Sequence, residues 1–135
     1  MVGLDTNVLV RLLYDDQKAP EQVAAARSLE RRIIECKSRF YITSVVLCET
    51  FWVMTHGYGV PNHQVIEQLQ QLLLNPFYIF EHPKRVEVTL KALETHKVDF
   101  TDVFIAEGGE EADCQMTYTF DKKASKYPAF TLLKK

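Results

Sequence analysis

The stretch that decides the fold is the first one, MVGLDTNVLVRLLY at residues 1–14. A short apolar run ends at the carboxylate of Asp5, and apolar residues resume from Val8 to Leu13 with the spacing of one helical face. The stretch therefore predicts a strand, an acidic residue and a helix in that order. In an open α/β sheet, ligands bind beyond the carboxyl ends of the strands, so Asp5 is expected at a site. The alternative is that Asp5 only caps the helix.

Composition sets the broad class of the chain. With 135 residues, 47% hydrophobic and 25% charged, it is expected to be one globular domain, residues 1–135, with its own core. The formal net charge is only −2, so no overall basic field attracts a polyanion. Any surface that binds nucleic acid must therefore be local.

The cysteines argue against a fold that depends on disulfides or on a thiolate zinc site. Cys36, Cys48 and Cys114 are odd in number and form no C-x-x-C pair, so we expect free thiols in a reducing cytoplasm. The chain begins directly with the predicted strand, without the pattern of a signal peptide. No apolar run approaches the ~18 residues of a membrane span. We therefore expect a cytoplasmic protein with no membrane partner.

Helical and strand patterns alternate along the rest of the chain. Periodicity and turn residues predict helices at residues 20–36, 44–54, 61–73, 83–96 and 101–112, and strands at 39–43, 77–80, 116–120 and 130–133. Ser44 and Thr101 are the predicted N-caps, and Asp113 is predicted in the left-handed region at a helix end. The pattern indicates an α/β fold. It offers no reason for Gly108 and Gly109 inside a helix beyond close packing or a kink.

Glu49 interrupts a segment, residues 44–54, that is apolar almost all round. Such a segment predicts a helix buried on most faces, where an isolated carboxylate is costly unless something pairs with it. The alternative is that Glu49 lies on one wet side of the helix, paired with Arg11 or a lysine.

Four acids are expected on one edge of the sheet. Asp5 and Asp121 each close a strand, Asp102 lies in the first turn of a helix, and Glu49 lies early in a helix that follows a strand. In a parallel sheet with right-handed crossovers these places fall on the same rim. The alternative for Asp102, and for Asp99 beside it, is that both only stabilise a helix start.

A cluster of carboxylates needs protons or a cation to be stable at neutral pH. Oxygen ligands favour Mg²⁺ or Mn²⁺, whereas the four histidines are scattered and do not suggest zinc. A hydrated Mg²⁺ site suits phosphoryl chemistry, because the metal activates water and offsets charge on a phosphate. The sequence has no Walker motif for nucleotide triphosphates and no G-x-S-x-G motif for acyl transfer.

At these acids the chain resembles PIN-domain ribonucleases, in particular the VapC-type toxins of bacterial toxin–antitoxin pairs. The resemblance rests on four motifs in order, which are Asp5-Thr6-Asn7, Glu49 in SVVLCE, DFTDVFIA at 99–106 and TFDKK at 119–123. It covers the whole chain. The chain departs from the family pattern at Gly108-Gly109, where alanines are usual, and at Asp113, where glycine is commoner.

The resemblance implies a three-layer α/β/α fold with a central, mainly parallel sheet. It implies an endoribonuclease that depends on Mg²⁺ or Mn²⁺, with Asp5, Glu49, Asp102 and Asp121 forming the acidic site. It also implies a homodimer, inhibited by an antitoxin whose tail, often with an arginine, occupies the acidic groove.

The mechanism expected on this basis is metal-assisted hydrolysis of an RNA phosphodiester. A Mg²⁺ ion held by Asp5, Asp102 and Asp121 would activate water, and Glu49 would hold a second metal or orient the water. Thr6, Asn7 and Asp99 would support the site. The cations nearest in sequence, which would guide the RNA backbone, are Arg11, Lys122, Lys123 and Lys126.

Two other functions stay open from the sequence. One is a phosphatase of the haloacid-dehalogenase type with Asp5 as covalent nucleophile, although that motif wants a second Asp where this chain has Asn7. The other is a PIN-like fold kept only as a binding module, which loss of one or two acids would mark. All the acids are present.

Overall fold

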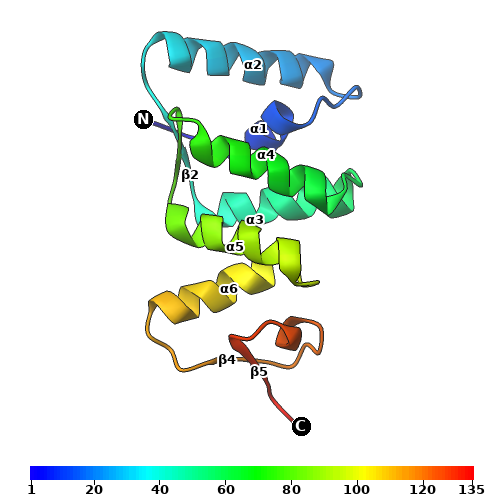
Figure 1. Cartoon of the computed structure of the whole chain (residues 1–135). Helices are drawn as coiled ribbons and strands as arrows, with labels where there is room; N and C mark the ends of the chain where they lie inside the picture. The colour runs from blue at the N-terminus through cyan, green and yellow to red at the C-terminus, as the bar shows by residue number, and fades with distance from the viewer. The chain divides into compact units, whose positions relative to one another are not determined.

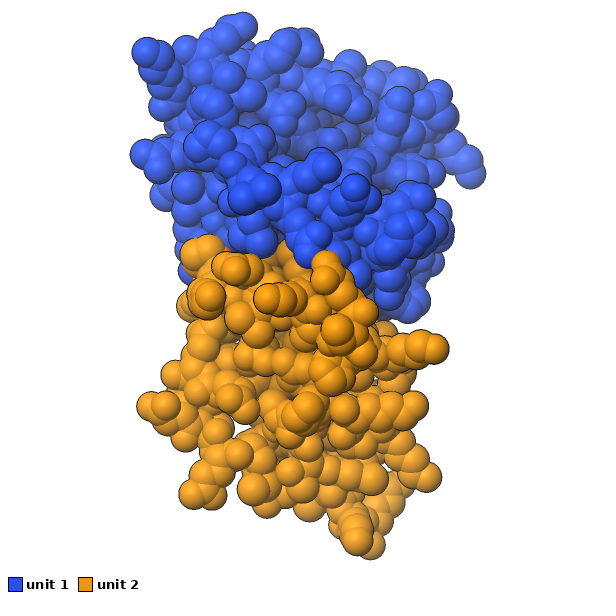
Figure 2. Space-filling model, viewed as in Figure 1, with its two compact units in different colours: residues 1–81 blue, residues 82–135 orange.

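The computed structural model describes all residues from Met1 to Lys135. The chain forms two compact units, residues 1–81 and residues 82–135, shown in separate colours in Figure 2.

Unit 1 is built on a parallel sheet of three strands in the order β1-β2-β3. The strands are β1 (Val2–Gly3), β2 (Phe40–Ile42) and β3 (Tyr78–Phe80). Phe40 and Ile42 of the middle strand are completely buried. The connections are helical (Figure 1), as parallel strands require, and comprise α1 (Thr6–Leu13), α2 (Pro20–Glu35), α3 (Ser44–Trp52), the π-helical turn η1 (Val53–Gly57) and α4 (Asn62–Leu74).

Unit 2 places two helices beside a second, smaller parallel sheet. The helices are α5 (Pro83–Thr95) and α6 (Phe100–Glu111), and the strands β4 (Thr117–Thr119) and β5 (Phe130–Leu132) flank the 3-10 turn η2 (Ala124–Lys126). One core joins these elements, because buried side chains from α6, η2 and β5 pack together. They are Val98, Val103, Ala106, Ala124, Tyr127 and Phe130.

The predicted α/β class is confirmed, since helices alternate with parallel strands along the chain. Each predicted helix and strand is present, with ends that differ from the prediction by a few residues. Asp113 has a φ of +63°, so the predicted left-handed residue after α6 is also confirmed. Cys36, Cys48 and Cys114 are free thiols. None of the helices combines the length and the apolar character that a membrane-spanning helix requires.

Both predicted N-caps are wrong by one or two residues. Thr43 rather than Ser44 caps α3, because the Thr43 hydroxyl accepts a hydrogen bond from the Val46 N–H at 3.3 Å. Asp99 rather than Thr101 is the N-cap of α6. The helix begins earlier than predicted, at Phe100, whose ring is buried.

The prediction that α3 is buried on most faces is also wrong. Val46, Leu47, Thr50 and Phe51 form one buried stripe, whereas Val45 and Trp52 are 69% and 58% exposed. An apolar residue type does not by itself ensure burial, because much of any protein surface is apolar. Glu49 lies on the exposed side of the helix, so the alternative of a wet face is the one observed.

The structure supplies the missing reason for the two glycines in α6. A Cβ atom at Gly109 would lie 2.7 Å from the hydroxyl oxygen of Thr117 in β4. A Cβ atom at Gly108 would lie 3.2 Å from the Arg85 guanidinium, which makes a two-point ion pair with Glu111 at 3.1 and 2.7 Å. The glycines therefore let α6 approach α5 and β4 closely.

Candidate active site

Asp5 stands at the carboxyl edge of the sheet in unit 1. Strand β1 is fixed beside β2 by hydrogen bonds from Val2 N–H to Arg39 O (2.8 Å) and from Leu4 N–H to Tyr41 O (3.2 Å). The chain then turns into α1, for which Asp5 is the N-cap, and its Oδ1 accepts a hydrogen bond from the Thr6 N–H at 2.7 Å. The carboxylate is exposed. Asp5 therefore does cap the helix, and it also offers oxygen to solvent.

Glu49 is joined to the same motif across 43 residues of sequence. The Thr6 hydroxyl donates a hydrogen bond to Glu49 Oε1 at 2.8 Å, which connects the start of α1 to the middle of α3. Glu49 therefore forms its hydrogen bond with Thr6, not with Arg11 or a lysine. The structure thus brings together Asp5, Thr6 and Glu49, which we call the unit 1 acidic group.

Arg11 is engaged inside unit 1. Its guanidinium donates to Tyr58 Oη at 2.8 Å and to Gln22 Oε1 at 2.9 Å, and lies 3.5 Å from Asp16 Oδ2. The Tyr58 hydroxyl donates in turn to Asp16 at 2.8 Å. Hydrogen bonds from the Lys18 N–H and from Tyr58, with the nearby Arg11 charge, hold the pKa of Asp16 below its usual 3.8 despite its burial. Arg11 therefore has a structural role that the sequence did not indicate.

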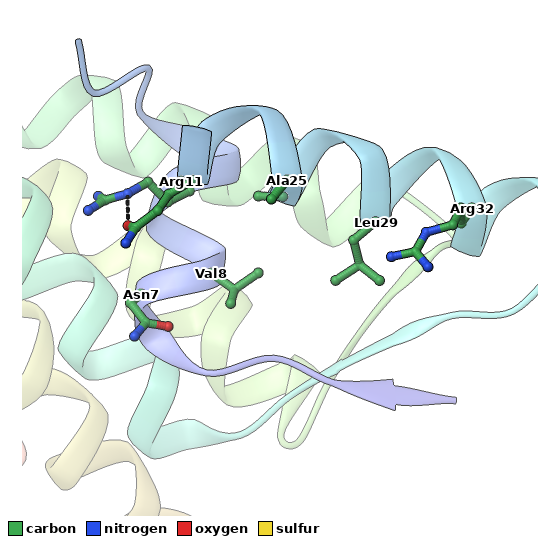
Figure 3. Close-up of a pocket in the computed structure, with 8 residues that line it drawn as sticks. Asn7, Val8, Arg11, Ala25, Leu29 and Arg32 are labelled. Atoms are coloured by element: carbon green, nitrogen blue, oxygen red, sulfur yellow. Dashed lines mark hydrogen bonds between the residues drawn. The ribbon is translucent and has the colours of Figure 1, made fainter. Parts of the chain in front are cut away.

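A pocket of about 370 Å³ opens between α1 and α2 (Figure 3). Its lining includes Asn7, which is two residues after Asp5. Val8, Ala25 and Leu29 give it an apolar middle, while Asn7 and Arg11 lie at one end and Arg32 lies at the other. Asn7 is exposed and contributes to this pocket.

In unit 2, Asp99 and Asp121 lie close enough to Asp102 to affect its ionisation. Asp102 lies half-buried in the first turn of α6, as predicted. Partial burial, and then the negative charges of Asp99 and Asp121, hold the pKa of Asp102 above its ordinary value of 3.8, and the positive charge of Lys123 offsets part of this. We call Asp99, Asp102, Asp121 and Lys123 the unit 2 acidic group.

Asp121 is oriented by the turn that follows β4. Its own N–H donates to the Thr119 hydroxyl at 3.0 Å, and its Oδ1 accepts from the N–H groups of Lys123 at 2.8 Å and Ala124 at 3.3 Å. Lys123 Nζ forms an ion pair with Asp99 Oδ1 at 3.0 Å, in which both side chains are about half exposed. Lys122 and Lys126 are exposed. Of the three predicted lysine contacts, Lys123 is therefore already paired.

The donor types of both groups fit a hard cation better than a soft one. Within neither unit do three or more acidic, histidine or cysteine side chains converge closely enough to form a metal site by themselves. The oxygens of carboxylates and of a threonine hydroxyl nevertheless suit Mg²⁺ or Mn²⁺. In unit 2, three carboxylates and one ammonium group leave a formal charge of −2 when all are ionised, which a divalent ion compensates.

The residues that sequence reasoning missed are those defined by side-chain contacts. Asp16 and Tyr58, which lie 5 and 47 positions from Arg11, hold its guanidinium. The stacked pair Trp52 and His56, on the exposed side of α3, was also missed. Its signal was present in the sequence, because both side chains lie at helical spacing from Glu49.

Comparison with known proteins defines the family. No curated protein and no solved structure was found to match the chain. The family model described as PIN domain matches residues 2–129, a span that includes Asp5, Glu49, Asp102 and Asp121. The match confirms the PIN-like α/β fold predicted from the sequence. The chain therefore belongs to the PIN domain family, whose members are generally nucleases.

Proposed function

We propose that this PIN domain is a metal-dependent endoribonuclease, with Asp5, Asp102 and Asp121 as ligands of Mg²⁺ or Mn²⁺. The observation that carries the proposal is the unit 2 acidic group, in which half-buried Asp102 is surrounded by Asp99 and Asp121 with only Lys123 in compensation. Maintaining that charge without a counterion destabilises the fold. A bound divalent ion would offset the negative charge of the unit 2 acidic group.

The side chains have separate tasks in this proposal. The backbone N–H groups on Asp121 Oδ1 orient that carboxylate, and the Thr6 N–H does the same for Asp5. Glu49, whose Oε1 accepts from Thr6, keeps Oε2 to orient the attacking water. When bound, the metal lowers the pKa of water and offsets charge on the phosphate. Hydrolysis leaves a 5′-phosphate and a 3′-hydroxyl, as the family resemblance implies.

Cations must guide the RNA backbone, because the acids repel it. Lys122 and Lys126 are exposed and suit this role. Lys123 and Arg11 are weaker choices, since Lys123 is paired with Asp99 and Arg11 is held by Tyr58, Gln22 and Asp16. Asn7 borders the pocket next to Asp5 and is proposed as a supporting residue, together with Thr6 and Asp99.

The direct test is cleavage of labelled single-stranded RNA with Mg²⁺, with EDTA, and with Mg²⁺ restored. We expect cleavage that depends on metal and is lost in Asp5→Asn. The matched control is Asp15→Asn, which removes an exposed carboxylate outside both acidic groups and should leave cleavage unchanged.

Three other outcomes would contradict the proposal. Cleavage that persists in EDTA would exclude metal-dependent hydrolysis. A trapped phosphoaspartate at Asp5 on a small phosphoester would support the phosphatase, which the PIN family match disfavours. If the protein neither binds metal nor cleaves RNA, the remaining alternative is a PIN domain that acts only as a binding module.

The more specific role that we propose is a VapC-type toxin. The proposal takes residues 1–135 as a single PIN domain that forms a homodimer in the cytoplasm, a compartment in keeping with its three free thiols. An antitoxin with an arginine-bearing tail would neutralise the charge of the acidic groups. Expression in bacteria should arrest growth, Asp102→Asn should abolish the arrest, and a small neighbouring reading frame should relieve it. Unimpaired growth despite RNA cleavage by the purified protein would contradict the toxin role alone.

A further inference from the structure

The exposed side of α3 and η1 carries an aromatic surface next to Glu49. Val45, Glu49, Trp52 and His56 are spaced at four, three and four residues, so they share one face, opposite the buried stripe that includes Leu47 and Phe51. Trp52 is 58% exposed, which is uncommon for so large an apolar side chain. It lies three residues beyond Glu49, about 4.5 Å along the helix axis.

The indole of Trp52 is held in place by His56. Their rings stack almost parallel, with centroids 5.3 Å apart and an interplanar angle of 14°. The Thr55 hydroxyl donates to the Phe51 carbonyl at 2.8 Å, and its oxygen forms a hydrogen bond with His56 Nδ1 at 3.1 Å. This contact fixes the imidazole, and the imidazole supports one face of the indole.

The backbone changes type at this point. The π-helical turn Val53–Gly57 begins at the residue that follows Trp52, and the Tyr58 N–H donates to Val53 O at 3.0 Å in the i to i+5 pattern. Single π turns within helices are frequent at functional sites. The helix therefore departs from regular geometry where it presents the aromatic pair.

We propose that Trp52 is a stacking platform for an unpaired base of the RNA substrate, beside Glu49. This inference rests on the proposed ribonuclease function and adds a residue, Trp52, that would hold the RNA next to Glu49. Stacking on an aromatic ring is the sequence-tolerant way in which proteins hold unpaired bases, whereas bases inside a duplex are already stacked. The ring supported from one side by His56 offers the flat, rigid face that this contact needs.

Trp52 is the only tryptophan in the chain, so its emission reports on this surface alone. The full-length Asp102→Asn protein, which is expected to bind without cleaving, is titrated with a fluorescein-labelled single-stranded RNA 12-mer and with the same RNA as a duplex. We expect the single strand to quench indole emission with the same Kd that fluorescence anisotropy gives, and the duplex to quench far less. Binding seen by anisotropy with unchanged indole emission would overturn the proposal. So would an emission change that follows dilution of the protein alone and ignores RNA, because a second copy of the chain would then cover Trp52.

Cleavage by variants of the active chain supplies the second readout. Trp52→Leu should raise KM for single-stranded RNA about 10-fold, the effect expected for one lost stacking contact, and Trp52→Phe should restore most of the affinity. Leu74→Ala is the control, because Leu74 is an 85% exposed apolar side chain at the end of α4. If folded Trp52→Leu cleaves RNA in a metal-dependent way with unchanged KM, the stacking role of Trp52 is wrong and the ribonuclease function stands. If RNA quenches the indole emission but the original chain cleaves no RNA, the ribonuclease function is wrong and the stacking role of Trp52 stands.

Discussion

The two acidic groups are built on different principles. In unit 1, Asp5 and Glu49 are exposed, and they accept hydrogen bonds from the backbone N–H and the hydroxyl of Thr6. In unit 2, Asp102 is half-buried among Asp99, Asp121 and Lys123, and the pKa of Asp102 is raised. Water can solvate the first group, whereas the second maintains negative charge against desolvation and repulsion. The comparison teaches that unfavourable electrostatics are concentrated in unit 2, at Asp102.

The strongest challenge to this comparison is Asp102→Asn. We expect cleavage to fall about 1000-fold, since a lost metal ligand removes stabilisation of charge in the transition state. Without metal, however, the variant should melt at a higher temperature than the original chain, because it removes the desolvation cost of the Asp102 carboxylate and its repulsion from Asp99 and Asp121. Thermal melting in EDTA and in Mg²⁺ measures both effects. A lower melting temperature in EDTA would show that Asp102 is stabilised, not strained, by its neighbours.

In unit 1 the corresponding test is Thr6→Val, which removes the hydroxyl that donates to Glu49 at 2.8 Å. We expect kcat/KM to fall about 10-fold, the usual order for a hydrogen bond to a charged group, with little change in melting temperature. Thr6→Ser keeps the hydroxyl and should retain activity. Equal losses in the serine and valine variants would mean that the methyl group, not the hydrogen bond, positions Glu49.

The close packing that supports the unit 2 group can be tested at Gly109. Alanine at this position favours the helix by about 1 kcal/mol relative to glycine. It also places a Cβ atom 2.7 Å from the hydroxyl oxygen of Thr117. We expect Gly109→Ala to lower the free energy of unfolding by about 1 kcal/mol, because overpacking outweighs propensity. In a Thr117→Ala background the same change should become stabilising, and urea denaturation measures both. An unchanged sign would show that Thr117 is not the obstacle.

The smallest expected effect is an opposite pH dependence of stability in the two units. The pKa of Asp16 in unit 1 is lowered in the folded state, so its stabilisation is present above its unfolded value of 3.8 and is lost as pH falls through the folded value. The pKa of Asp102 is raised in the folded state, so its contribution to the free energy of unfolding is fully present below the unfolded pKa of 3.8. That contribution is lost as pH rises through the folded pKa.

Urea denaturation in EDTA between about pH 3 and pH 7 separates these two contributions. Asp16→Asn should be less stable than the original chain near neutral pH, and the difference should shrink in acid. Asp102→Asn should be more stable near neutral pH, and that difference should also shrink in acid. Differences of the same sign in both variants would contradict the contrast between the units.

Local signals were sufficient for much of this protein. The order of helices and strands, and the acids at the ends of β1 and β4 and at the start of α6, follow from hydrophobic periodicity and turn chemistry. These interactions act within a few residues, so a single sequence reveals them. The left-handed position of Asp113 is of the same kind.

Only the tertiary structure decided which acids have partners and which faces meet water. The Thr6 bond to Glu49 spans 43 residues, and the ion pair of Lys123 with Asp99 spans 24. Helix α6 begins at the buried Phe100 with Asp99 as its N-cap, and Trp52 is exposed because only one stripe of α3 packs on the core. Such features depend on contacts between segments far apart in the chain. Residue type and spacing describe each segment alone, and therefore carry no record of what lies beside it after folding.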